Sequence, residues 1–212
     1  MLQYVVVKVE SLPKKTPTLI ILHGYGADEY DLISVAQAFP PLNIISIRAP
    51  IELPWGGYAW YHLEQTAEGL RGDELTRSQN EELLRLAITE ILDKEQLEKD
   101  NILLLGFSQG AAMSYSLLAA PPDGVSIKAI AALSGYVPFE IKKTLSSITL
   151  NNLPVFISHG EDDELISPKA LDEASEILRS AGAEITANKY AMGHSVSNEV
   201  ISDLKVWFSK HF

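Results

Sequence analysis

A serine flanked by glycines is the first position in this chain with an obvious chemical use. Ser108 is the centre of a G-x-S-x-G pattern, GFSQG, at residues 106–110. At average glycine and serine usage, the bare pattern arises by chance in about one chain of this length in fifteen. The residues around it therefore decide whether it marks a reactive serine. An apolar run at residues 101–105 precedes it and a small-residue segment at 111–113 follows it. This context predicts a strand-to-helix turn that exposes the serine Oγ as a nucleophile; the alternative is a glycine-rich turn without chemistry.

A serine nucleophile needs a base and an acid that orients the base, and both have candidates later in the chain. An apolar run at residues 154–158 is followed by four consecutive acidic residues, 161–164. One of these is the predicted acid, and at least three are better explained as a solvated loop. His194 lies between a weaker strand candidate at residues 184–190 and the last predicted helix, and it is the predicted base. The order serine, acid, histidine is that of the α/β-hydrolases and differs from the orders in chymotrypsin and subtilisin.

The other four histidines are weaker candidates for the base. His23 precedes the serine and His159 adjoins the acidic loop, and both are interpreted as structural. His62 lies in an aromatic loop before the serine. His211 is one residue from the chain end, where fraying would prevent accurate positioning.

Backbone amides could stabilise the negative charge that develops when a serine attacks a carbonyl group. The turn at Ser108 directs the Gln109 N–H and the following helix N-terminus toward such an oxygen. The loop at residues 23–28 follows an earlier apolar run and supplies a second amide, for which we choose Tyr25. The two N–H groups are the predicted oxyanion hole.

The longest irregular stretch, residues 49–77, is rich in proline, glycine and aromatic side chains. Long ordered loops in small domains are usually functional, so this one is the predicted wall of the substrate pocket. Aromatic clusters also pack without binding anything, so a role in capping the sheet stays open. The four aromatic residues concerned are Trp55, Tyr58, Trp60 and Tyr61.

Short apolar runs alternate with segments of helical period, which is typical of an α/β fold with a mostly parallel sheet covered by helices. The surest helix contains apolar residues at three- and four-residue steps between 83 and 92, and Ser78 with Glu81 predicts a capping box at its start. Ser167 with Pro168 predicts the start of a later helix that stops near Gly182, and Ser197 predicts the last helix start. We expect one domain over residues 1–212. The predicted strands are residues 18–23, 43–47, 101–105, 128–133, 154–158 and 184–190, with another near the N-terminus.

Composition excludes several classes of function. The net charge is −11 and the sequence pI is near 4.9, which disfavours nucleic-acid binding. The absence of cysteine excludes disulfides, thiolate metal sites and a cysteine nucleophile. No apolar stretch reaches the roughly 20 residues of a spanning helix and no targeting signal is recognisable, so we expect a cytoplasmic protein without stable membrane insertion. The acidic residues Asp28, Glu29 and Asp31 are interpreted as helix-start partners; we expect no metal and no cofactor, and a homodimer stays open.

Six short motifs together resemble the phospholipase/carboxylesterase family of α/β-hydrolases, which includes bacterial carboxylesterases and acyl-protein thioesterases. The resemblance covers nearly the whole chain and departs at Ser167, where the family usually has proline. It implies that the acid is Asp163, the base is His194 and the oxyanion amides are those of Tyr25 and Gln109. The motifs are LHGYGAD (22–28), GGYAWY (56–61), GFSQGAAMS (106–114), LSGY (133–136), HGEDDELIS (159–167) and GHS (193–195).

The predicted protein is therefore an α/β-hydrolase with helices on both sheet faces and no large cap domain. We expect it to cleave carboxylic ester or thioester bonds of small molecules with short-to-medium acyl groups, through an acyl-enzyme on Ser108. Acyl-protein thioesterase and lysophospholipase activities are alternatives. An acyltransferase and a catalytically silent binding protein are further ones.

Overall fold

The computed structural model describes residues 1–9, 16–66 and 69–212. Its centre is a seven-stranded sheet in the order β1-β3-β2-β8-β9-β10-β11. All neighbouring strands are parallel except β1, which runs antiparallel to β3 at one edge. The strands are β1 (Tyr4–Val7), β2 (Thr18–Leu22), β3 (Asn43–Ile47), β8 (Ile102–Phe107), β9 (Ile127–Leu133), β10 (Pro154–Gly160) and β11 (Glu184–Tyr190).

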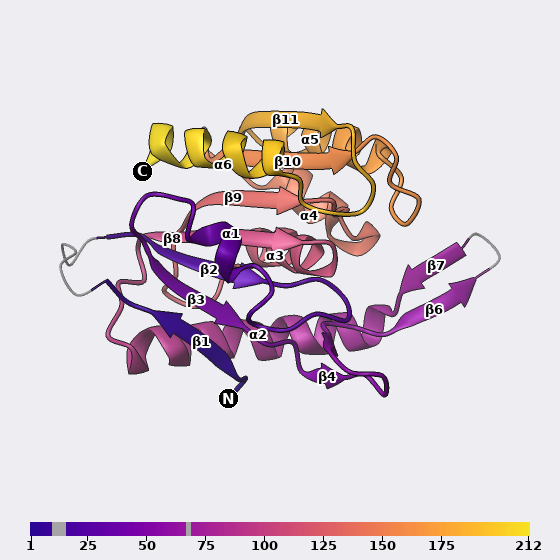
Figure 1. The fold of residues 1–212 in the computed structure, drawn as a ribbon. Coiled ribbons are helices and arrows are strands. Elements are labelled where there is room, and N and C mark those ends of the chain that lie inside the picture. The colour runs from indigo at the N-terminus through magenta and orange to yellow at the C-terminus, as the bar shows by residue number, and fades with distance from the viewer. Residues whose placement is uncertain (10–15, 67–68) are drawn as a thin grey trace.

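Helices cover both faces of this sheet (Figure 1). Alternate residues of one strand enter opposite cores: Ile20 of β2 belongs to the core that includes residues of α2, α3 and α5, and Ile21 belongs to the core that includes residues of α1 and α6. This two-sided burial explains why the strands are near-continuous apolar runs. The helices are α1 (Ile33–Ala36), α2 (Glu74–Lys94), α3 (Gln109–Ala119), α4 (Lys142–Ser147), α5 (Lys169–Ser180) and α6 (Asn198–His211), with a 3₁₀ turn, η1 (Phe139–Ile141), before α4.

Helix α2 begins earlier than the predicted capping box, and that prediction is wrong. Its N-cap is Asp73, whose carboxylate accepts a hydrogen bond of 2.8 Å from the Thr76 N–H. Ser78 instead donates to the Leu75 carbonyl. Glu81 is held inside the molecule by an ion pair with Arg77, so it is not available to a helix start. By contrast, Ser197 caps α6 as predicted, with Oγ accepting from the Val200 N–H at 3.4 Å.

The stretch at residues 49–77 is more regular than predicted. It contains a small ladder between β4 (Ile51–Glu52) and β5 (Tyr58–Ala59) and a hairpin of β6 (Leu63–Thr66) with β7 (Gly69–Gly72). Figure 1 shows the hairpin extending from the end of the molecule to which the arrows of β9 and β10 point. The stretch therefore lies at the carboxyl edge of the parallel sheet, where ligands of open α/β sheets bind.

Candidate active site

Ser108 lies on a sharp turn between β8 and α3 at the carboxyl edge of the sheet. Its backbone angles, φ 54° and ψ −116°, are strained for a residue with a side chain. The flanking glycines make the turn possible: a Cβ on Gly106 would overlap the Gly110 carbonyl, and one on Gly110 would overlap the Leu22 carbonyl of β2. A hydrogen bond of 2.9 Å from the Ser108 N–H to the Leu133 carbonyl ties the turn to β9.

The close approach at Gly110 predicts that Gly110→Ala destabilises the protein. Because rigid backbone of β2 would have to move, we expect a loss of about 3 kcal/mol or more and a melting temperature lower by roughly 6–12 °C. Thermal unfolding followed by circular dichroism measures this. Gly124→Ala is the matched control, since that site has open space around it and only the strain of φ +69°. An equal, small shift for both variants would show that the turn does not need glycine at 110.

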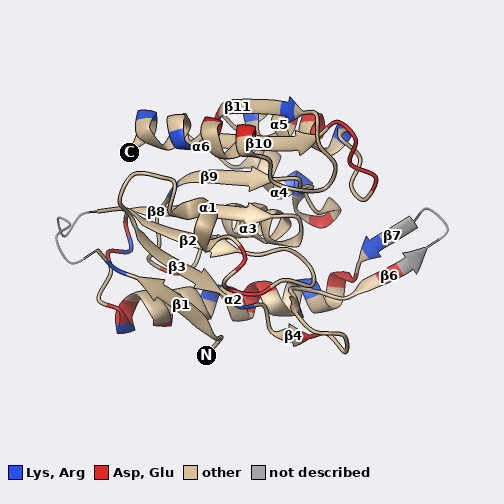
Figure 2. Cartoon of the chain, viewed as in Figure 1, with Lys and Arg blue, Asp and Glu red and all other residues tan. Residues whose placement is uncertain are grey.

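Asp163 lies in the acidic loop that follows β10 (Figure 2), and its carboxylate is the buried one of the four. Oδ1 accepts hydrogen bonds from the N–H groups of Leu165 at 3.0 Å and Ile166 at 2.9 Å. Burial alone raises the pKa of Asp163, but the Ile166 N–H and the His194 imidazole outweigh it and hold that pKa below its usual range. The side chain is therefore a carboxylate with a fixed orientation.

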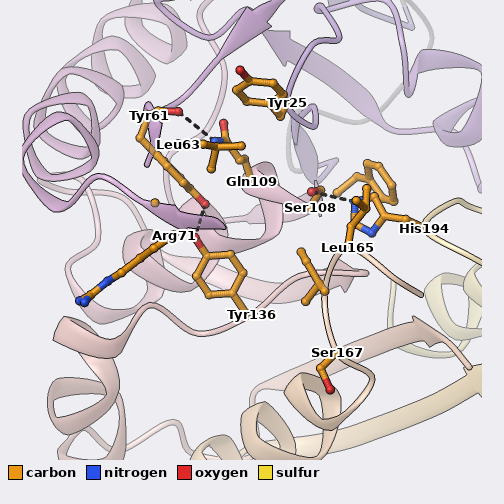
Figure 3. Close-up of a pocket in the computed structure, with 13 residues that line it drawn as sticks. Tyr25, Tyr61, Leu63, Arg71, Ser108, Gln109, Tyr136, Leu165, Ser167 and His194 are labelled. Atoms are coloured by element: carbon orange, nitrogen blue, oxygen red, sulfur yellow. Dashed lines mark hydrogen bonds between the residues drawn. The ribbon is translucent and has the colours of Figure 1, made fainter. Parts of the chain in front are cut away.

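His194 lies on the loop between β11 and α6 and links the other two side chains. Its Nδ1 is 2.7 Å from Asp163 Oδ2, and its Nε2 is 2.9 Å from Ser108 Oγ. Since the carboxylate only accepts, Nδ1 carries the proton and Nε2 is left to accept from the serine hydroxyl. The loop can approach β10 because residue 160 is glycine: a Cβ there would overlap the carbonyls of Met192 and Gly193. The structure thus brings the three predicted residues together, and Figure 3 shows the contact between Ser108 and His194.

Tyr25 and Gln109 line the same cavity as Ser108. Within the described ranges, neither backbone N–H donates a hydrogen bond to the protein, as a predicted oxyanion hole requires. The side chain of Gln109 is engaged elsewhere: Oε1 accepts from the Trp60 N–H and Nε2 donates to the Tyr61 carbonyl, each at 2.9 Å. This side chain therefore anchors the aromatic segment, a role that the sequence did not reveal.

A cavity of about 550 Å³ opens beside Ser108 and His194 (Figure 3). Its walls are mainly apolar, with Phe107, Leu165 and Ile166 near the reactive side chains and Leu63 contributed by the hairpin. Such a surface suits the hydrocarbon part of an ester.

The predicted pocket wall needs correction, because only Tyr61 of the four aromatic residues lines this cavity. Trp55 is 71% exposed. Tyr58 packs against Arg48, whose guanidinium lies 4.4 Å from the ring centroid. Trp60 is fully buried and its indole N–H donates to the His23 carbonyl at 2.9 Å. Trp60 therefore belongs to the core under the site, as the alternative interpretation of these rings allowed.

The sequence reasoning missed Tyr136, which reaches the cavity from the loop after β9. Its hydroxyl lies 2.8 Å from that of Tyr61, and the pair forms a polar corner in an otherwise apolar wall. Burial raises the pKa of Tyr136 and raises that of Tyr61 well above its usual value, so both hydroxyls remain protonated. The LSGY motif was the available signal for Tyr136. Leu63 and Arg71 also line the cavity, but no pattern in the sequence indicated this.

The remaining predicted groups are engaged in the structure. His23 is buried, and its Nε2 accepts from the Ala49 N–H at 3.0 Å. Glu29 holds Arg48 through two hydrogen bonds of 2.6 Å. Among the residues that the structure describes, no group of three or more histidine or acidic side chains is arranged to hold a metal ion. No helix in those same ranges has the length and apolar character needed to cross a bilayer.

A mostly parallel sheet with helices on both faces and a serine on the turn after its central strand defines the α/β-hydrolase fold. The family model of phospholipases and carboxylesterases matches residues 3–212, and the chain belongs to this family. The chain is thus an esterase-type hydrolase. The predicted fold class, family and enzyme class are confirmed.

Three relatives illustrate the similarity. A carboxylesterase of Bacillus cereus has a solved structure that is 26% identical, covers 100% of this chain and 95% of its own, and superposes with a TM-score of 0.84. Acyl-protein thioesterase 1 homolog 1 of Dictyostelium discoideum is 27% identical over 91% of this chain and 89% of its own. The probable carboxylesterase SOBER1-like of Arabidopsis thaliana is 32% identical over 57% of this chain, but this match spans only 47% of that relative.

Proposed function

We propose that this protein hydrolyses carboxylic esters by covalent catalysis at Ser108, with His194 as base and Asp163 as the acid that orients it. The observation that carries the proposal is the continuous hydrogen-bond chain from Ser108 Oγ through both nitrogens of His194 to Asp163, at 2.9 and 2.7 Å. Its members come from three separate loops at one edge of the sheet. The fold does not need this arrangement for its stability, whereas nucleophilic serine catalysis requires it.

In the first half of the proposed reaction, Ser108 Oγ attacks the ester carbonyl carbon while His194 Nε2 takes the hydroxyl proton. The negative charge on the carbonyl oxygen is held by the N–H groups of Tyr25 and Gln109. When this tetrahedral intermediate collapses, the bond to the alcohol oxygen breaks and His194 gives its proton to the departing alcohol. The acyl group is left on Ser108.

In the second half, a water molecule gives a proton to His194 as its oxygen attacks the acyl-enzyme carbonyl. Collapse of this second intermediate returns the proton to Ser108 Oγ and releases the carboxylic acid. Asp163 stays ionised throughout and stabilises the imidazolium that forms in each half. The lowered pKa of Asp163 supports this role.

A thioester is the second candidate substrate, because the same acyl-enzyme forms when a thiolate is the leaving group. The D. discoideum relative is named an acyl-protein thioesterase, and this favours a thioesterase as the alternative activity. Purified protein assayed in parallel on p-nitrophenyl esters, acyl thioesters and lysophospholipids separates the candidates through kcat/KM.

The size and lining of the cavity support a preference for short-to-medium acyl groups. Leu165 is 73% exposed at the cavity wall, where an acyl chain would cover it. Each methylene that contacts this surface would contribute up to about 0.8 kcal/mol, or roughly fourfold in kcat/KM, until the cavity is full. We expect kcat/KM to rise from acetate to a medium chain and then fall toward palmitate.

Leu165→Ala should lower kcat/KM for p-nitrophenyl hexanoate about three- to tenfold more than for the acetate, since only the longer chain reaches this side chain. Leu86→Ala is the control, because Leu86 is a leucine 56% exposed on α2 that does not line the cavity. Two results would contradict this expectation. A steady rise through palmitate would exclude a small acyl site, and equal losses for both esters would remove Leu165 from it.

A further inference from the structure

A second histidine, His159, lies beside the carboxylate of Asp163. It is the second-last residue of β10 and is fully buried. Its Nε2 lies 3.2 Å from Asp163 Oδ2 and 2.9 Å from the Ile166 carbonyl oxygen. Its Nδ1 is also buried and has no hydrogen-bond partner among the residues that the structure describes.

These contacts fix where the His159 proton lies. Both neighbours of Nε2, a carbonyl oxygen and an ionised carboxylate, can only accept, so Nε2 carries the hydrogen. A second proton on Nδ1 would be buried without an acceptor, which is costly. The His159 N–H therefore donates to the Ile166 carbonyl and lies beside the Asp163 carboxylate.

This N–H lies against a carboxylate that is held by three hydrogen bonds. Oδ1 of Asp163 accepts from the backbone N–H groups of Leu165 and Ile166. Oδ2 forms a hydrogen bond of 2.7 Å with His194 Nδ1 and is 3.2 Å from His159 Nε2. Because His159 also holds the Ile166 carbonyl, it braces the turn at residues 163–166 that both supplies the acid and forms part of the cavity wall.

The position of His159 also affects the acid. The positive end of its buried N–H dipole lies beside Oδ2, the oxygen that His194 contacts. This electrostatic contact favours the observed orientation of the Asp163 carboxylate. The other acidic residues of this loop, Glu161, Asp162 and Glu164, are exposed and contact neither imidazole.

We propose that His159 is a positioning residue for catalysis: by holding the Ile166 carbonyl, it keeps the turn at residues 163–166 where Asp163 contacts His194. The proposal rests on the roles of Asp163, His194 and Ser108 proposed above. This role goes beyond packing, although His159 touches neither the substrate nor the Ser108 hydroxyl.

The test compares His159→Leu, which removes the donor, with His159→Gln, whose amide N–H₂ can donate to the Ile166 carbonyl from the same position as Nε2. We expect His159→Leu to lower kcat roughly three- to tenfold with KM little changed, because the lost hydrogen bond acts on the turn that orients Asp163 and not on substrate binding. His159→Gln should restore kcat, and His62→Leu, at an exposed histidine, is the control.

Three results would overturn the proposal. The first is a folded His159→Leu protein with unchanged kcat. The second is equal impairment of folded Leu and Gln variants, which would reduce His159 to packing. The third needs no variant: long-range ¹H–¹⁵N spectra of the wild-type protein must show the His159 hydrogen on Nε2, and a hydrogen on Nδ1 would contradict the geometry. If Ser108→Ala stays active, the proposed function itself fails; if Ser108→Ala is inactive and His159→Leu is unaffected, only the positioning role fails.

Discussion

Ser108→Ala is expected to lower kcat for p-nitrophenyl acetate by on the order of 10⁶-fold, the scale of loss when the nucleophile of a serine triad is removed. Only the residual contribution of binding and of the oxyanion amides should remain. The substitution removes one oxygen from a turn whose shape depends on Gly106 and Gly110, so the protein should stay folded. Initial rates at saturating substrate, with circular dichroism to verify folding, measure the effect.

Ser167→Ala is the matched control for that experiment. Ser167 lines the same cavity, but its hydroxyl accepts only a long hydrogen bond of 3.4 Å from the Lys169 N–H. Its kcat should remain within about threefold of the wild-type value, as expected for removal of one weak hydrogen bond. A folded Ser108→Ala protein that keeps even one hundredth of the wild-type kcat would place the nucleophile elsewhere.

The second large effect is expected from Asp163→Asn, which should lower kcat about 10⁴-fold with little change in KM. The amide that replaces the carboxylate is neutral and can turn its N–H₂ toward His194, which would favour the tautomer that cannot accept the serine proton. The loss should appear in single-turnover acylation, because His194 must act before any acyl-enzyme forms.

Asp162→Asn provides the control for this substitution. Asp162 is the adjacent residue and carries the same charge, but its side chain is exposed. We expect a change in kcat of less than about twofold. Comparable losses in both variants would indicate that the net charge of the acidic loop matters and that neither carboxylate has a specific partner.

The sequence could select the three side chains that the structure brings together because each lies in a loop that follows a predicted strand. In a parallel sheet the carboxyl ends of the strands meet at one edge, so a serine after β8 and an acid after β10 must come near each other. His194 follows β11, which pairs with β10. Short-range patterns and one rule of topology were therefore sufficient to select these positions, while the resemblance to a family was needed to choose Asp163 among four acidic residues.

The aromatic segment was harder to predict because its burial depends on contacts that are distant along the chain. Trp60 is placed by the side chain of Gln109, which bonds to its backbone from 49 residues away. Nothing near residue 60 indicates that the ring points into the core. Tyr61 likewise reaches the cavity beside a distant residue, Tyr136, which lies 75 residues further on and whose hydroxyl contacts that of Tyr61.

The start of α2 was predicted wrongly for a related reason. Ser78 and Glu81 have the spacing of a capping box, but Glu81 accepts a hydrogen bond of 2.6 Å from the Ser116 hydroxyl of α3. This buried partner, together with Arg77, outweighs the local pattern. Likewise, His159 was interpreted as structural from the sequence, because its contact with Asp163 depends on how the following loop turns back.

The most direct test of covalent catalysis at Ser108 is peptide mapping by mass spectrometry after the wild-type protein reacts with a fluorophosphonate probe. The account predicts one phosphonyl group per chain, attached to Ser108, with activity lost in proportion to the modification and no labelling of the Ser108→Ala protein. Inactivation with the adduct on another residue, or full labelling of Ser108→Ala, would contradict it.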